Sequence, residues 1–398
     1  MILNILIIVI AVLLSSYLAF SPKLKKSSSW QAMVTPLASI MGSGFLVSAP
    51  LLGGVVGVKA VFCMAILLVI AYGVGSVMRY NITHFEPIEN ESGHPQQLAF
   101  VSRIILAGAY FISVTYYLQL LAAFLLKSLG ISHPHMANWI TTALLLSIGI
   151  IGIWRGLGML EKMEKYAVAL NLGMIGSLLF ALVVYNINLA SQGTWALPDI
   201  SSDINGNDIR VLLGLLIVVQ GFETSRYLGD QHKAEERIKT MKYAQITASI
   251  IYLLFISLAT VLFHKDMGAD VTAIIEMTTP VALVLPTLLV VAAIGSQFSA
   301  AVADNAGAGG LIGEITNHRV PVRYAYLLIL LVTINLAWET NVNLIIVYAS
   351  KAFALFYLLQ SCLACSLAKR NKEPKRMILF AGLAIVCAFV FFIGAPAE

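Results

Sequence analysis

The stretch Ile40-Met41-Gly42-Ser43-Gly44-Phe45 lies in the middle of an apolar segment, about residues 31–57, that is long enough to cross a bilayer. Glycine lowers helix propensity and lets a ligand approach the backbone closely. Inside a membrane, the N–H and C=O groups freed by a broken helix are tolerated only where they line a cavity or are buried in protein. We therefore predict that the helix is broken at Gly42–Gly44 and that the freed backbone binds a small anion. Close helix packing is the alternative explanation, because small residues are common at membrane helix interfaces.

The composition is that of an integral membrane protein. Of the 398 residues, 59% are hydrophobic and 11% are charged, whereas soluble domains have about 25% charged residues. The net charge of +5 comes from basic residues in short loops between apolar runs, so we expect no nucleic-acid partner. All cysteines lie in apolar segments, which favours buried side chains over a metal or redox site: Cys63, Cys362, Cys365 and Cys387.

Twelve apolar segments predict an all-α protein with about 12 transmembrane helices. We number the spans from the second segment, which makes residues 31–57 core helix 1. The segments lie near residues 3–20, 31–57, 59–78, 98–128, 136–154, 165–186, 208–226, 243–264, 278–304, 322–338, 341–368 and 376–395.

The distribution of basic residues predicts the orientation of these spans. Of the 25 lysines and arginines, 20 lie in one set of alternating loops, and four lie in the opposite set. Basic residues accumulate in cytoplasmic loops, so both chain termini are expected to be extracytoplasmic. Residues 1–20 lack a basic start and are followed by Lys23, Lys25 and Lys26, which favours an uncleaved helix over a signal peptide.

A second irregular site, Gln220-Gly221-Phe222-Glu223-Thr224-Ser225, lies in core helix 6, residues 208–226. Core helices 1 and 6 are therefore both interrupted by glycine, lie five spans apart and cross the membrane in opposite directions. This arrangement is expected of a transporter built from an inverted repeat, with its substrate site at the midplane. Simple helix packing does not predict the matched placement.

The two motifs resemble those of permeases in the amino acid–polyamine–organocation (APC) superfamily. Ile40 to Phe45 is similar to the first-helix signature, and Gly221-Phe222-Glu223 is similar to the sixth-helix motif. The resemblance covers about residues 31–395 and implies the leucine-transporter fold, a 5+5 inverted repeat with broken core helices 1 and 6. We expect an extra N-terminal helix and loop in residues 1–30, repeats in 31–186 and 187–368, and a C-terminal helix in 369–398.

The resemblance also implies a substrate site. The backbone amides at Gly42, Ser43 and Gly44, in the motif that begins at Ile40, would hold a substrate carboxylate. Carbonyl groups from Gln220 to Phe222, including Gly221, would accept the substrate ammonium, with Phe222 covering the substrate. Freed N–H groups attract anions and freed carbonyls attract cations, so elementary electrostatics agrees. Tyr110, a polar residue of core helix 3, either lines this site or bonds a neighbouring helix.

Ionisable side chains inside spans are costly, so each is a candidate functional residue. Glu223 lies at the second break, where burial favours the neutral carboxyl and allows proton exchange; the resemblance implies a similar coupling role. Alternatively, Glu223 holds the break together by hydrogen bonds. Lys351 lies about ten residues into core helix 10 and needs a carboxylate partner, for which Glu223 is proposed, or it reaches the outer membrane surface.

A third group of candidates lies on core helix 8. Ser296 and Asp304 fall on one helical face, and Ser299 adds a hydroxyl. In sodium-coupled relatives of the implied fold, hydroxyls on this helix and carbonyls on core helix 1 hold a sodium ion. Ser299-Ala300 is an incomplete match to that pattern, so Asp304 either supplies charge to an ion site or ends the helix before the glycine-rich stretch 305–310.

These observations predict a secondary active transporter of a small amino acid or related amine, proton-coupled or an exchanger. The alternatives are a sodium symporter of the same fold and a membrane sensor or subunit that binds without flux. No nucleotide-binding motif and no catalytic motif is visible, so we expect no enzyme activity and no cofactor besides a coupling H⁺ or Na⁺. The expected partners are the solute and the lipid bilayer, and the expected location is a bacterial inner membrane. Substrate identity, transport direction and oligomeric state stay open.

Overall fold

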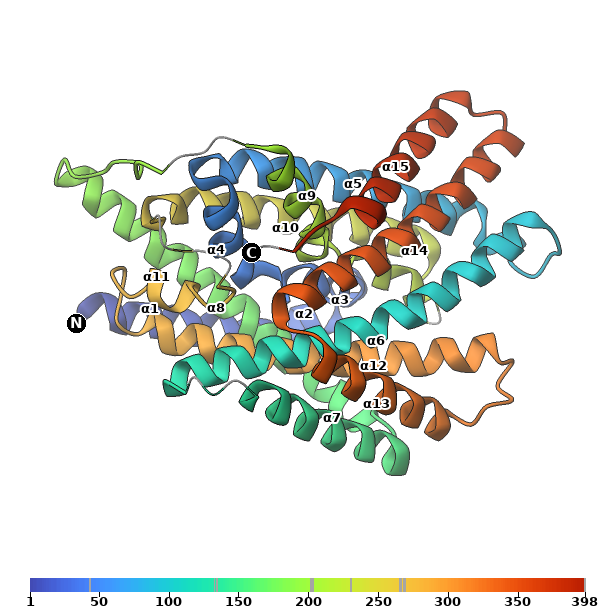
Figure 1. The fold of residues 1–398 in the computed structure, drawn as a ribbon, viewed down its shortest axis with the longest axis horizontal. Coiled ribbons are helices and arrows are strands. Elements are labelled where there is room, and N and C mark those ends of the chain that lie inside the picture. The colour runs from blue at the N-terminus through green and yellow to red at the C-terminus, as the bar shows by residue number, and fades with distance from the viewer. Residues whose placement is uncertain are drawn as a thin grey trace.

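Long helices lie side by side along most of the protein, with short turns gathered at two ends (Figure 1). The computed structural model describes residues 1–396 except Ser43, Ser132, Pro134, 201–203, Asp230, 265–266 and 268–269, with the backbone alone for Arg155 and residues 158–165. The principal helices are α1 (Ile2–Phe20), α2 (Pro22–Lys26), α3 (Ser28–Met41), α4 (Gly44–Val56), α5 (Ala60–His84), α6 (His94–Leu129), α7 (Met136–Arg155), α8 (Gly158–Ser191), α9 (Gly206–Gly214), α10 (Ala234–Ala259), α11 (Ile274–Met277), α12 (Leu285–Ile315), α13 (Val322–Glu339), α14 (Val342–Arg370) and α15 (Pro374–Ile393). Short 3₁₀ helices include η2 (Glu86–Ile88), η3 (Leu216–Val219) and η4 (Phe222–Leu228).

The helices account for all twelve predicted spans. Within the described residues, ten helical stretches are long and apolar enough to cross a membrane, and one of them, Ser28–His84, contains two predicted spans. The predicted span 208–226 is helical in three pieces, α9, η3 and η4. The prediction of an all-α membrane protein with about 12 spans is therefore confirmed.

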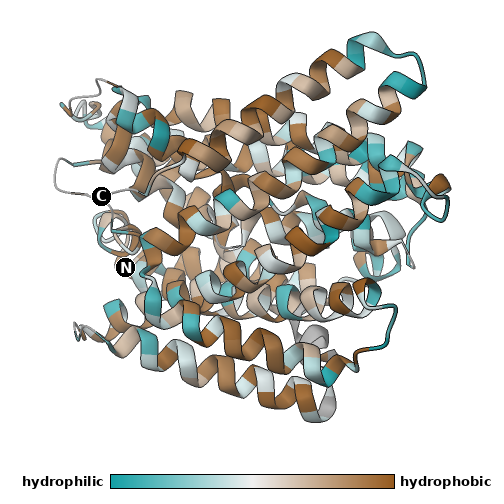
Figure 2. Ribbon diagram, turned by 45° about the vertical axis from the view of Figure 1, so that its right-hand side comes forward, coloured by the Kyte–Doolittle hydropathy of each residue, from teal (hydrophilic) through white to brown (hydrophobic). Residues whose placement is uncertain are grey.

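The polar and apolar parts of the helices are arranged as a bilayer requires. Hydrophobic residues dominate the middle of the bundle, and hydrophilic residues gather at the turns of one end (Figure 2). That end holds the turns between α5 and α6, between α12 and α13, and between α14 and α15 (Figure 1). Both chain termini lie at the opposite end (Figure 2). The extra helix α1 packs along α8 and exposes large apolar side chains such as Ile5 and Leu13, as a lipid-facing helix should.

Both predicted helix breaks are present. Helix α3 ends at Met41, and α4 begins at Gly44, after a non-helical Gly42 with ψ of −85°. In core helix 6, Gln220 is extended and Gly221 has φ of 121°, which only glycine adopts easily, so η3 and η4 are separate. The two interrupted helices lie against one another, since α3 packs on η4 and α4 packs on η3.

The end of core helix 8 differs from the prediction. Asp304 does not end this helix, because α12 continues to Ile315. The glycines after Asp304 provide close packing instead of a turn: a Cβ at Gly307 would lie 3.1 Å from the Tyr110 ring, and one at Gly309 would lie 2.9 Å from the Tyr326 ring. Small residues let neighbouring membrane helices approach in this way. Asp304 therefore lies inside a membrane-spanning helix.

Candidate functional site

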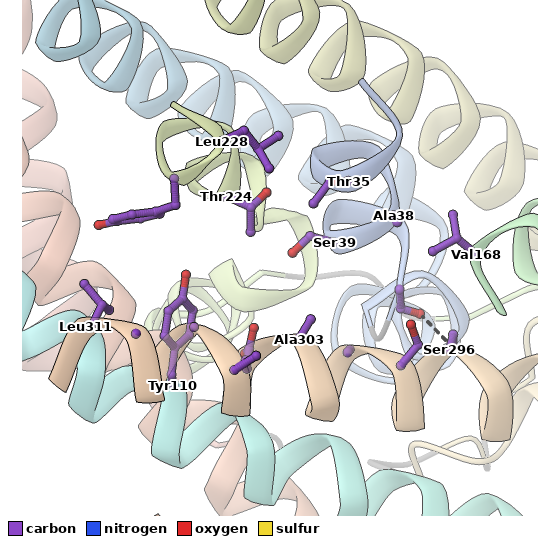
Figure 3. Close-up of a pocket in the computed structure, with 18 of the residues that line it drawn as sticks. Thr35, Ala38, Ser39, Tyr110, Val168, Thr224, Leu228, Ser296, Ala303 and Leu311 are labelled. Atoms are coloured by element: carbon purple, nitrogen blue, oxygen red, sulfur yellow. Dashed lines mark hydrogen bonds between the residues drawn. The ribbon is translucent and has the colours of Figure 1, made fainter. Parts of the chain in front are cut away.

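A cavity of about 340 Å³ lies beside the first helix break. It is lined by α3, α6, α8, α12 and η4, and Figure 3 shows their side chains around it. The α12 wall is formed by residues that recur with each helical turn, singly or as adjacent pairs, which places them on one side of the helix. They include Ser296, Ser299, Ala303, Asp304 and Gly307.

Polar side chains meet the carbonyls freed at the first break. The Ser296 hydroxyl lies 3.4 Å from the carbonyl oxygen of Gly42, and the Asn171 amide donates to the Met41 carbonyl at 3.3 Å. Gly42, Asn171 and Ser296 all line the cavity, and the Ser296 contact is the dashed line in Figure 3. This end of the cavity therefore combines backbone carbonyls with a hydroxyl and a side-chain amide.

A buried carboxylate forms part of the cavity wall. Asp304 is 7% exposed and accepts a hydrogen bond from the Ser113 hydroxyl of α6. One turn before Ser113, the Tyr110 ring reaches into the cavity, across from Thr224 of η4 (Figure 3). A carboxylate on the wall of a membrane-embedded cavity offers hydrogen-bond acceptors to a cationic group.

The side chains of Gln220 and Glu223 at the second break do not line the cavity. One oxygen of the Glu223 carboxylate accepts from the Gly221 N–H at 3.0 Å and from the Tyr357 hydroxyl at 2.7 Å. The same hydroxyl lies 2.7 Å from the Gln220 side-chain oxygen, and the Tyr357 ring stacks on Phe222. None of Gln220, Phe222 and Glu223 lines the cavity; Thr224, Tyr227 and Leu228 of η4 do. The hydrogen bonds are those of a residue that holds the break together.

Lys351 does not pair with Glu223. The ion pairs of the described residues do not include this one, and Lys351 is half-buried on α14. The side of α14 that faces η3 carries Ser350, whose hydroxyl accepts from the Ile217 N–H at 3.0 Å. Successive residues on a helix point about 100° apart, so Lys351 faces another direction. The predicted ion pair of Lys351 with Glu223 is therefore not present among the described residues.

Tyr252 of α10 joins the two broken helices. Its hydroxyl lies 2.9 Å from the Ile40 carbonyl oxygen and 2.5 Å from the Val218 carbonyl oxygen. A Cβ on Gly44 would collide with the backbone of Val218, so the adjacent backbones of α4 and η3 are in direct contact. Ile40 and Gly44 therefore lie at this junction and do not line the cavity, and Ser43 lies outside the described residues.

The cavity continues toward the end that carries the basic loops. Tyr227 and Glu314 line both it and a polar cavity of about 280 Å³, whose walls include Arg103 and Arg237. Arg237 pairs with Glu86 at 2.6 Å on this path. On the other side of the break, the backbones of α4 and η3 are packed against each other. The solute cavity and the polar cavity therefore share Tyr227 and Glu314 as wall residues.

The structure brings five predicted site residues to one cavity: Gly42, Tyr110, Ser296, Ser299 and Asp304. The sequence reasoning missed Thr35 and Ser39 of α3 and Tyr227 of η4 as lining residues. Their spacing from the two breaks is the signal that was available, because each lies within two helical turns of Gly42 or Gly221 on the half-helix that lines the cavity.

Comparisons with known proteins agree with this architecture. A family model described as APC superfamily transporter matches residues 22–394. An uncharacterized protein of Aquifex aeolicus (strain VF5) is 44% identical over 393 residues, which are 96% of this chain and 95% of that protein.

Two solved structures share the fold at low sequence identity. A mutant of the manganese transporter of Eremococcus coleocola has a TM-score of 0.60 at 12% identity, over 93% of this chain and 87% of that one. MhsT in complex with L-phenylalanine has a TM-score of 0.58 at 13% identity, over 92% of this chain and 98% of that one. The predicted leucine-transporter fold is confirmed, and the chain belongs to the APC superfamily of transporters.

Proposed function

We propose that this protein is a secondary active transporter of a small amine-bearing solute, such as an amino acid. The observation that carries the proposal is Asp304, a carboxylate on the wall of the cavity beside the first break. An ammonium group has three donors and a positive charge. Asp304 and the Tyr110 hydroxyl offer acceptors for such a group, and the carbonyl of Gly42 lies beside Ser296, about two turns of α12 away, at the other end of the same cavity.

Transport would proceed by alternating access. In the present conformation the cavity leads past Tyr227 to Glu314, while α4 and η3 are packed together on the far side. Opening of the far side would require these two half-helices to separate, and closing of the near side would require α3 and η4 to move against α12. Transporters with discontinuous helices commonly rock such elements around a fixed site.

The coupling ion would be a proton carried by Glu223, or the protein would be an exchanger. Glu223 is 1% exposed and accepts from the Gly221 N–H and the Tyr357 hydroxyl, so a change in its protonation would alter the contact between η4 and Tyr357. A sodium symporter is the second candidate. The specific observation in its favour is the cluster of oxygens from Gly42, Ser296 and Ser299 at the end of the cavity, since hard cations prefer oxygen ligands.

The first experiment is a thermal-shift screen of the purified protein against amino acids, polyamines, organic acids and manganese, in sodium and in potassium buffers at two pH values. A ligand that binds the native state raises the melting temperature. We expect one class of amine to stabilise the wild type and not Asp304→Asn. The matched control Asp199→Asn changes an exposed loop residue and should behave as wild type.

Flux of the stabilising solute into proteoliposomes then separates the transporter from a sensor. Uptake driven by a pH gradient or by exchange supports the proposal, and uptake that requires sodium moves the coupling to Ser296 and Ser299. Binding without flux would establish the sensor or subunit alternative. If only organic acids or manganese stabilise the protein, and Asp304→Asn does not change this, the proposal of an amine-bearing substrate is contradicted.

A further inference from the structure

A second large cavity, of about 420 Å³, lies on the back of the helices that form the solute site. It is enclosed by α1, α2, α3 and α8, and most of its lining is apolar. The apolar side chains include Leu18, Leu24, Val34 and Leu172, and Trp30 lies beside them. A cavity of this character suits a hydrocarbon chain.

One rim of this cavity is strongly basic. Lys25 is a lining residue, and Lys23 and Lys26 are exposed on the same short helix α2. The Lys25 ammonium lies 5.3 Å from the centroid of the Phe20 ring, at the end of α1. Because α1 is long enough to span the bilayer and ends at Phe20, α2 lies at the depth of the lipid headgroups.

We propose that this cavity binds one anionic phospholipid, with an acyl chain in the cavity and the headgroup phosphate at Lys25. The positive charge of the α2 lysines favours an anionic lipid over a neutral one, since basic clusters next to membrane spans attract anionic headgroups. Trp30 is placed as tryptophans usually are at the membrane interface, with an apolar body and a polar N–H. Lipid binding goes beyond the proposed transport and does not depend on it.

The position of the lipid gives it a means to influence the solute site. Val34 of α3 lines the lipid cavity, and the next residue, Thr35, lines the solute cavity. On α8, Leu172 lines the lipid cavity, and the preceding Asn171 lines the solute cavity and donates to the Met41 carbonyl. A bound acyl chain would therefore support α3 and α8 from behind and hold α3 in its present position.

The test is native mass spectrometry of the full chain in detergent, titrated with phosphatidylglycerol, phosphatidylcholine or glycerol 3-phosphate. We expect one phosphatidylglycerol to be retained in preference to phosphatidylcholine. Lys25→Gln should weaken that retention about fivefold. Ala19→Trp, which places an indole in the cavity lining, should reduce it further, because the acyl chain loses its space.

Matched controls separate the cavity from a general effect of charge or bulk. Lys375→Gln removes an exposed lysine at the start of α15, and Ala381→Trp adds an indole on the exposed face of the same helix. Both should retain phosphatidylglycerol as wild type does. Equal retention of both lipids, or retention unchanged in Lys25→Gln and Ala19→Trp, would overturn the proposal. Competition by glycerol 3-phosphate would assign the lysines to a free phosphate and also overturn it.

Discussion

The two broken helices have similar sequence signatures and opposite surroundings. At the first break, Gly42 borders a cavity, and the Ser296 hydroxyl lies 3.4 Å from the Gly42 carbonyl oxygen, which is a long hydrogen bond. At the second break, the Gly221 N–H is bonded to Glu223 at 3.0 Å, and Glu223 is in turn bonded to Tyr357 at 2.7 Å. One break leaves backbone groups beside open space, whereas the other closes upon itself.

The neighbours of each break cause this difference. The first break faces α12, whose face from Ser296 to Gly307 is made of small residues that leave a cavity. The second break faces α14, where Tyr357 and Phe353 are both fully buried and fill the space. A cavity therefore forms beside a glycine-interrupted helix where the facing helix leaves room, whereas buried aromatic side chains fill the space beside the other break.

The largest effect is expected from Gly221→Ala. Gly221 has φ of 121°, and its added Cβ would lie 2.7 Å from the Ser39 carbonyl carbon and 2.8 Å from the Ile40 nitrogen. Backbone strain and overlap should lower the free energy of unfolding by about 2–4 kcal/mol. The measurement is the melting temperature in detergent, with Gly108→Ala, where a Cβ has nothing within 4 Å, as a control that should not lose stability. Equal stability of the two variants would show that the second break is not tightly packed.

The two buried carboxyls should respond differently to neutralisation. Asp304→Asn should weaken substrate binding about 10- to 100-fold, because a charged hydrogen bond in a buried site is lost. Glu223→Gln should leave binding within about threefold of wild type, since Glu223 does not line the cavity. If Glu223 carries the proton, its variant should instead lose the dependence of flux on a pH gradient.

Isothermal titration calorimetry gives the binding constants, and proteoliposome uptake at several pH gradients gives the coupling. A large loss of affinity in Glu223→Gln together with wild-type affinity in Asp304→Asn would reverse the roles of the two breaks. Retained pH dependence in Glu223→Gln would remove Glu223 as the proton carrier while leaving the solute site unchanged.

Much of this comparison was predictable from the sequence. Glycine between apolar runs marked both breaks, and the apolar segments predicted the number of spans, because both depend on local composition and membrane physics. The sequence was a weaker guide to which side of a helix packs against a given neighbour. Lys351 and Ser350 are neighbours in sequence, yet Ser350 bonds η3 and Lys351 does not, and only helix packing decides between them.

The roles of Tyr252 and Tyr357 had no visible signal either. Each tyrosine lies in an ordinary apolar segment, and its importance comes from long-range contacts to the breaks. The glycines after Asp304 were misleading for a related reason: glycine in a membrane span marks either a turn or a close-packed face, and the choice depends on whether a partner such as Tyr110 lies opposite.

Tyr252→Phe and Tyr357→Phe should each cost about 1–3 kcal/mol of stability, because buried polar groups lose a hydrogen-bond partner. They should differ in function. Tyr252 bridges the carbonyls of Ile40 and Val218, so its variant should change the rate at which the half-helices separate. Tyr357 bonds Glu223, so its variant should change the pH dependence of flux. Uptake kinetics at several pH values distinguish the two, and identical profiles would mean that both tyrosines are merely structural.

The smallest effect is expected from Ser296→Ala. Its hydroxyl lies 3.4 Å from the Gly42 carbonyl and 3.3 Å from that of Ala293, and both contacts are long, so their loss should cost at most about 1 kcal/mol. Solute affinity should fall no more than about fivefold. The control is Thr316→Ala, which removes a hydroxyl from the C-cap of α12, outside the cavity lining. The response of this variant to sodium tests whether the first break holds the coupling ion. If the oxygens at the first break hold sodium, Ser296→Ala should raise the sodium concentration needed for half-maximal stabilisation at least tenfold, far more than its effect on the solute. An unchanged sodium response would leave the first break as a solute site alone, and coupling would then depend on Glu223 at the second break.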